Sequence, residues 1–222
     1  MSQELSNLLE RLRQLTTSEI SDALDRLGIE GQALGITASF ASERIVGPAF
    51  TLSYLPKGET EGTVGDFIDD VPAGHVVVID NRGRLDCTVW GNIMCEVGKQ
   101  RGLGGAVIDG ICRDADLARE IGFPVYARAS AMRTGKDRVA LEAIGAPIVV
   151  AGVRVEPKDI VVADAGGVVF IPEAKLEEVV RIADDIASCE DKILEAVGNG
   201  RSLREARKLL GYHNLQSREN LV

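Results

Sequence analysis

The residues with the clearest chemical potential are Arg113 and Asp114, in the segment GAVIDGICRDADLARE. A guanidinium can bind a carboxylate through two parallel hydrogen bonds, and a neighbouring Asp can hold a hard divalent cation directly or through water. Together they would suit a small anionic oxo acid bound with Mg²⁺. A structural alternative stays open, in which Asp114 only caps a helix and Arg113 pairs with Asp109 or Asp116.

A second candidate stretch, Gly91-Asn92-Ile93-Met94, lies near the start of an expected helix. The first N–H groups of a helix have no partner within it, so they can donate to a bound carboxylate. The glycines in this region also have a purely structural interpretation, because they permit tight packing of a helix on a sheet.

Short apolar runs predict the strands that position these residues. Between Arg44 and Asp164 the runs are RIVGPAFTLSYL, HVVVID, GAVID, PVYAR, APIVVAG and DIVVAD. Helical stretches at roughly 60–70, 87–101 and 114–121 alternate with some of them, which indicates an α/β fold. Ligands of α/β sheets gather beyond the carboxyl ends of the strands, and Arg113 and Asp114 follow such an end.

Helices are expected at both ends of the chain. Residues 1–28 predict a helical hairpin, with a Thr16-x-x-Glu19 capping box opening its second helix. Residues 44–172 form the expected α/β core, and 173–222 a C-terminal helical extension. No linker rich in Pro, Ser or charge divides the chain, so residues 1–222 are predicted to form a single domain.

Composition excludes several classes of protein. With 25 Lys+Arg against 34 Asp+Glu the net charge is −9, and aromatics make up 4%, so nucleic acid is not an expected direct partner. The four cysteines have no CxxC spacing and the two histidines lie far from them, which argues against structural zinc. The scattered thiols and the lack of an apolar leader or membrane span predict a cytoplasmic protein without membrane contact.

A resemblance to a known family joins these motifs. The segment GNIMCEVGKQRGLGGAVIDGICRDADLAREIGFPVYAR, followed by APIVVAGVRVEPKDIVVADAGGVVFIP, resembles the family of regulator of ribonuclease E activity A and the 4-hydroxy-4-methyl-2-oxoglutarate aldolases. The similarity extends from about Ile20 to Pro172. It implies a layered α-β-β-α fold of the swivelling-domain type, assembled as a homotrimer or homohexamer with the active site between subunits.

The resemblance also implies site residues and a reaction. Arg113 would contact the pyruvyl group, Asp114 would anchor Mg²⁺, Mn²⁺ or another divalent cation, and the amides of Ile93 and Met94 would hold the carboxylate. The implied activity is retro-aldol cleavage of a 4-hydroxy-2-oxo acid, or decarboxylation of oxaloacetate, through a pyruvate enolate. The metal and Arg113 would stabilise that developing anion.

The sequence departs from the family pattern at the catalytic position Asn92. Catalytically competent members carry an acid, twenty residues and then Arg-Asp, and this count back from Arg113 falls on Asn92. An amide can hydrogen-bond a metal-bound water but cannot act as a base. Glu96, one turn along the same helix, is a candidate replacement, although a solvated surface side chain is the simpler interpretation. Lys158 replaces a turn glycine, a change expected to be structural only.

Two other functions compete with the lyase interpretation. A non-catalytic regulator that binds ribonuclease E is compatible with the acidic charge, because acidic surfaces can dock on basic segments. The retained Arg113-Asp114 pair and the helical tail favour the aldolase. A methyltransferase, the label that members of this family often carry, is rejected because the expected Gly-rich loop after the first strand and acid after the second are not found.

Overall fold

The computed structural model describes residues 3–39, 44–58 and 64–212, which form two compact units. A helical unit contains the described residues up to Gly31 and from Ala174 onward, and an α/β unit contains Gln32–Glu173. The single domain expected over residues 1–222 stays a prediction. No helix in the described residues combines the length and apolar character that crossing a membrane requires.

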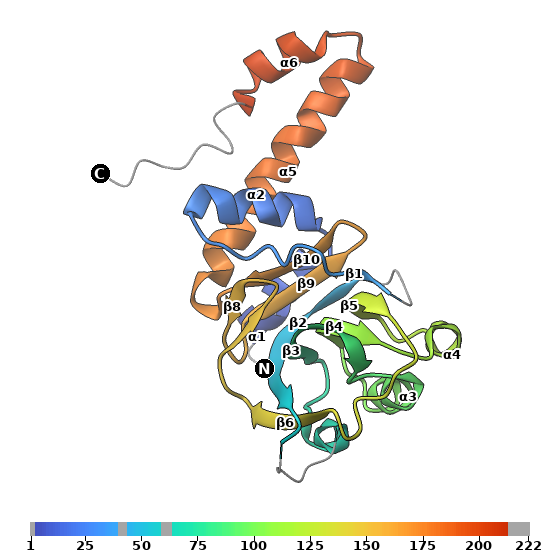
Figure 1. Ribbon diagram of the computed structural model, residues 1–222. Helices are drawn as coiled ribbons and strands as arrows, with labels where there is room; N and C mark the ends of the chain where they lie inside the picture. The colour runs from blue at the N-terminus through green and yellow to red at the C-terminus, as the bar shows by residue number, and fades with distance from the viewer. Residues whose placement is uncertain (1–2, 40–43, 59–63, 213–222) are drawn as a thin grey trace. The chain divides into compact units, whose positions relative to one another are not determined.

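The helical unit contains four α-helices: α1 Gln3–Leu12, α2 Thr17–Leu27, α5 Leu176–Gly198 and α6 Leu203–Leu209 (Figure 1). The predicted capping box is confirmed, because Thr16 Oγ1 accepts from Glu19 N at 3.2 Å and the Glu19 carboxylate accepts from Thr16 N at 2.6 Å. A short 3₁₀ helix, η2 Glu173–Lys175, precedes α5. The long helix α5 buries its apolar face and contacts both N-terminal helices, as its periodicity predicts.

The α/β unit is built on an eight-stranded sheet in the order β1-β5-β4-β3-β2-β9-β10, with β6 also paired to β2. A separate hairpin pairs β7 with β8. Strands β2, β3, β4 and β5 run parallel, whereas β6 and β9 pair with β2 in antiparallel fashion. The strands are β1 Thr37–Ala38, β2 Ile45–Pro56, β3 Val76–Thr88, β4 Gly105–Cys112, β5 Val125–Ser130, β6 Val139–Ile144, β7 Ile148–Val150, β8 Val153–Val155, β9 Ile160–Asp164 and β10 Gly167–Ile171.

Apolar layers cover both faces of the central strands. On one face β3 and β4 pack beneath α3 Asn92–Gln100, α4 Ala115–Ile121 and the 3₁₀ helix η1 Asp66–Asp70. Helices α3 and α4 lie side by side there (Figure 1). Alternate residues of the same strands point to the other face, where they meet the apolar residues of the β7–β8 hairpin. The parallel strands are buried on both faces, which explains their continuous apolar sequences.

Two predicted helices differ from the structure in their bounds, and strand β6 of the central sheet was not predicted. Helix α3 begins at Asn92 rather than near residue 87, because β3 continues to Thr88. In the described part of 60–70 only η1 is helical. Strand β6 was not predicted, because its sequence VALEAI includes the exposed residues Glu142 and Ile144. It is held in place by pairing with β2, which lies far away in the sequence. The α/β fold class itself is confirmed by the likeness to a solved relative reported below.

Candidate active site

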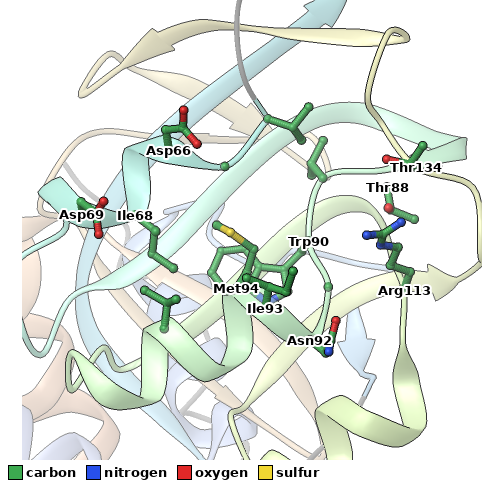
Figure 2. A pocket seen from close by; sticks show the side chains of 15 residues that line it. Asp66, Ile68, Asp69, Thr88, Trp90, Asn92, Ile93, Met94, Arg113 and Thr134 are labelled. Carbon is green, nitrogen blue, oxygen red and sulfur yellow. The ribbon is translucent and has the colours of Figure 1, made fainter.

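A cavity of about 370 Å³ opens beyond the carboxyl ends of the parallel strands β3 and β4. Figure 2 shows it between the start of α3, the segment after β4 and the 3₁₀ helix η1. Its lining includes five residues that the sequence proposes for substrate binding: Gly91, Asn92, Ile93, Met94 and Arg113. The structure therefore brings the two candidate segments together, as expected for an α/β sheet.

Trp90 fixes the backbone that carries these residues. The indole is 2% exposed, stacks on Phe123 with ring centroids 5.9 Å apart, and donates from Nε1 to Cys95 Sγ at 3.2 Å. The Trp90 carbonyl oxygen accepts from Arg113 N at 3.0 Å. This hydrogen bond ties the residue before Gly91 to the residue after β4, so the two halves of the site share one rigid base. Trp90 is thus a core residue that anchors the site.

The first turn of α3 offers free backbone donors. Gly91 is its N-cap and has no side chain with which to cap, and the first helical bond runs from Cys95 N to Gly91 O at 3.1 Å. In the described part of the chain the N–H groups of Ile93 and Met94 have no acceptor. A carboxylate placed at this turn could accept from both and would gain from the positive end of the helix dipole.

Asp114 occupies the N-cap position of α4 but does not cap it. Its backbone is left-handed, with φ 60° and ψ 40°, and its side chain makes no capping hydrogen bond. One carboxylate oxygen instead lies 3.3 Å from Arg113 Nε and 3.4 Å from Asn92 N. The capping alternative is therefore wrong. A non-glycine residue held with positive φ is uncommon and draws attention to the group that it presents.

The other partners proposed for Arg113 are already engaged elsewhere. Asp109 accepts from Arg128 Nε and, through its second oxygen, from Ala151 N at 2.7 Å. Asp116 pairs with Arg119 at 3.0 Å. Neither carboxylate lines the cavity. The side chain of Asp109 thus has different partners from the Arg113-Asp114 pair, although all three residues lie close together in the sequence.

Helix α3 offers no carboxylate to the cavity that could replace the acid expected at the position of Asn92. Glu96 is exposed, accepts from Gln100 Nε2 at 2.8 Å and does not line the cavity, so the prediction of a solvated side chain is confirmed. Cys95 lies beneath the same turn, where burial raises the pKa of its thiol to about 11. The thiol stays protonated near neutral pH and is a poor candidate nucleophile.

The site requires glycine at position 91 for space rather than for backbone conformation. Its φ of −157° is extended, yet a Cβ here would lie 2.7 Å from Asp114 Oδ2 and 3.1 Å from Arg113 Cγ. We predict that Gly91→Ala displaces both side chains and lowers catalytic efficiency by about 10- to 100-fold, because small misplacements of catalytic groups are costly. Steady-state kinetics on the purified variant measure the loss.

Gly58→Ala is the matched control, because a Cβ at Gly58 meets no atom within 4 Å. This variant should keep wild-type kinetics. Circular dichroism and thermal melting establish that Gly91→Ala remains folded. Unchanged activity in folded Gly91→Ala would show that the contact between Gly91 and the Arg113-Asp114 pair is not needed.

The donor set near Asp114 fits an open divalent-cation site. Among the described residues no group of three or more His, Cys, Asp or Glu side chains converges. A closed protein cage is therefore absent from that part of the chain. Mg²⁺ commonly keeps several waters and uses one or two carboxylates together with substrate oxygens. Asp114, with its side chain 31% exposed, provides one such carboxylate; it does not line the cavity itself but lies against Arg113 and Gly91, which do.

Several lining residues were missed by the sequence analysis. Val64, Asp66 and Asp69 come from η1 and the residues before it, and Thr134 reaches the site through a bridge to Thr88. For the residues of η1, the only sequence signal was the helix expected near 60–70. That prediction did not show which side of the segment would face α3. Contacts between segments so far apart in the sequence are not encoded in a local pattern.

Comparison with known proteins places the chain among named relatives. It is 39% identical over 211 residues to protein DlpA of Legionella pneumophila, an alignment that covers 93% of this chain and 34% of DlpA. The chain thus spans about a third of the length of DlpA. It is also 32% identical over 185 residues to a protein of Halalkalibacterium halodurans provisionally named a 4-hydroxy-4-methyl-2-oxoglutarate aldolase, covering 82% of this chain and 85% of that protein.

A solved structure supports the same assignment. RraAS2 of Streptomyces coelicolor, described as an unusual member of the RNase ES inhibitor RraA family, superposes with a TM-score of 0.76 at 27% identity. The superposition covers 88% of this chain and 96% of RraAS2. The family model described as RraA-like, Aldolase/RraA, matches residues 17–170. The resemblance predicted from the sequence is confirmed, and the chain belongs to the RraA-like family of aldolases and RraA proteins.

Proposed function

We propose that the protein is a carbon-carbon lyase, a divalent-metal-dependent pyruvate aldolase acting on 4-hydroxy-2-oxo acids. This class includes 4-hydroxy-4-methyl-2-oxoglutarate, after which the relative of H. halodurans is named. The observation that supports the proposal best is that Arg113 lines the same cavity as Ile93 and Met94, whose N–H groups have no acceptor in the described part of the chain. A homotrimer or homohexamer is the proposed assembly.

In this proposal the chain binds the pyruvyl end of the substrate. The N–H groups of Ile93 and Met94 hold its carboxylate, and the Arg113 guanidinium donates to the 2-oxo oxygen. Asp114 positions that guanidinium through the 3.3 Å contact with Nε. Asp114 would also hold Mg²⁺ or Mn²⁺, which supplies Lewis-acid stabilisation of the negative charge that develops on the substrate.

The bond between C3 and C4 then breaks and leaves a pyruvate enolate. Arg113 stabilises its oxygen, which is the largest contribution that the described residues can make to the reaction. The Asn92 amide hydrogen-bonds a water, and this water takes the proton of the 4-hydroxyl group as the bond breaks, because an amide cannot act as a base. Decarboxylation of oxaloacetate passes through the same enolate, so we propose it as a side activity.

Metal removal provides the direct test of this reaction. Pyruvate release from a panel of 4-hydroxy-2-oxo acids and oxaloacetate is followed in an NADH-coupled assay. We expect release in the presence of Mg²⁺ or Mn²⁺, loss of at least about 100-fold with EDTA, and recovery when the metal is restored. Failure to release pyruvate from any member of the panel with either metal would rule the proposal out.

A second proposed function is inhibition of a ribonuclease by direct binding. The similarity to RraAS2, a protein described within an RNase ES inhibitor family, favours it. The net charge of −9 is compatible with docking on basic segments. A pull-down with ribonuclease E that survives moderate salt would support this function, whereas absence of binding at low salt would count against it.

A further inference from the structure

The cavity carries opposite charges at its two ends. Arg113 lies at one side, and Asp66 and Asp69 of η1 lie at the other, as Figure 2 shows. Among the described lining residues Arg113 is the one cation, against two carboxylates. A ligand whose carboxylate is held near Arg113 must therefore extend its remaining atoms toward an acidic end.

The two carboxylates are not neutralised by strong ion pairs. Asp66 is exposed and has no hydrogen-bond or ion-pair partner in the described part of the chain. Asp69 is also exposed, and its Oδ1 lies 4.0 Å from Arg101 Nη1, at the outer limit of an ion pair. Both carboxylates would therefore face the distal part of a bound substrate without a close cation beside them in the described part of the chain.

An apolar wall separates the two ends. Its side chains are those of Val64, Ile68, Val89, Met94 and Val97. Ile68 and Val89 are 5% and 2% exposed, and the other three pack on the same core cluster while remaining partly accessible. Gly65 allows close approach here, because a Cβ on it would lie 3.0 Å from Met94 Sδ.

This wall offers no side-chain donor to a second carboxylate. A charged group placed against it would lose water without gaining a hydrogen bond, and it would also be repelled by Asp66 and Asp69. An uncharged alkyl group placed there would instead be stabilised by burial of apolar surface. Charge repulsion and apolar burial thus both favour a substrate whose distal part is uncharged and apolar.

We infer that the cavity selects monoanionic 2-oxo acids with an uncharged, apolar C4 substituent over dianionic substrates such as 4-hydroxy-4-methyl-2-oxoglutarate. The inference rests on the proposed function and narrows its substrate class. The bond between C3 and C4 breaks and its electron pair stays on C3, which takes a proton to give pyruvate. The 4-hydroxyl group loses its proton and becomes the carbonyl of an apolar aldehyde or ketone.

The turnover test compares 4-hydroxy-2-oxohexanoate with 4-hydroxy-4-methyl-2-oxoglutarate. In the wild-type protein with Mg²⁺ we expect kcat/KM to favour the monoanion by at least about tenfold. The double variant Asp66→Asn with Asp69→Asn should raise kcat/KM for the dianion about tenfold and change the value for the monoanion less than about twofold. Asp70→Asn is the matched control, because Asp70 is exposed on the same 3₁₀ helix but does not line the cavity.

A binding test separates failure of this inference from failure of the proposed function. Isothermal titration compares 2-oxopentanoate with 2-oxoglutarate, which have chains of the same length and differ in the second carboxylate. Tighter binding of 2-oxopentanoate, with the difference reduced in the double variant, supports the inference even if no substrate is cleaved. Equal or tighter binding of 2-oxoglutarate, or no binding of either acid, overturns it. A preference for the dianion in turnover overturns it and leaves the proposed aldolase intact.

Discussion

Arg113→Ala is expected to lower kcat/KM for pyruvate release by about 10²- to 10³-fold, the usual loss when one donor to a developing anion is removed. The guanidinium is the one cation among the described residues that line the cavity. Arg113→Lys keeps the charge but not the planar pair of donors, so it should recover only part of the activity. Steady-state kinetics with saturating Mg²⁺ measure both effects.

Protein stability should change little in Arg113→Ala. The side chain is 37% exposed and its ion pair with Asp114 is partly solvated, so the free energy of unfolding should fall by about 1 kcal/mol or less. Arg119→Ala removes a guanidinium from the neighbouring helix α4, where it pairs with exposed Asp116, and serves as the matched control. Equal activity in Arg113→Ala and Arg119→Ala would contradict the role of Arg113.

Asp114→Asn is expected to abolish the metal response and to lower pyruvate release by at least about 100-fold, because a neutral amide is a weak ligand for Mg²⁺. Asparagine tolerates a left-handed backbone, so the φ of 60° at this position should be kept. The amide oxygen can still accept from Asn92 N. The substitution therefore changes charge with little change of shape, and titration with Mn²⁺ followed by electron paramagnetic resonance measures the lost metal affinity.

Asp116→Asn provides the control for this charge change. Asp116 lies two residues further along, in the first turn of α4, with its side chain 95% exposed. The Asp116→Asn variant should retain wild-type activity and Mn²⁺ affinity. Wild-type metal binding by Asp114→Asn would contradict the assignment of Asp114 as the ligand, whether or not activity is lost.

Local sequence patterns predicted most strands of the central sheet and the two segments that meet at the site. Apolar runs identified β2, β3, β4, β5 and β9 because each is buried on both faces. The Arg113-Asp114 pair could be placed at a strand end because these charged residues come directly after the mostly apolar run that forms β4. Even the glycine-like turn at Lys158 agrees with the structure, since its φ is +75°. A lysine there carries the strain that glycine would avoid.

Pairings between distant segments could not be predicted in the same way. The sequence placed Asp109 beside Arg113, but β5 supplies Arg128 to the Asp109 carboxylate and the segment after β7 supplies Ala151 N. The acidic end of the cavity also escaped prediction, because Asp66 and Asp69 reach it only through the packing of η1 near α3. Substrate selectivity depends on these tertiary contacts, so it had no local signature.

In the proposed aldolase, the first turn of α3 and Arg113 bind the carboxylate end of a 2-oxo acid. We would follow this binding by ¹H–¹⁵N NMR of the whole chain during titration with pyruvate in the presence of Mg²⁺. We predict that the largest saturable shifts are those of the Ile93 and Met94 amides and the Arg113 Nε–H. Saturable binding that leaves these three signals unshifted, or no binding at millimolar pyruvate, would contradict the claim.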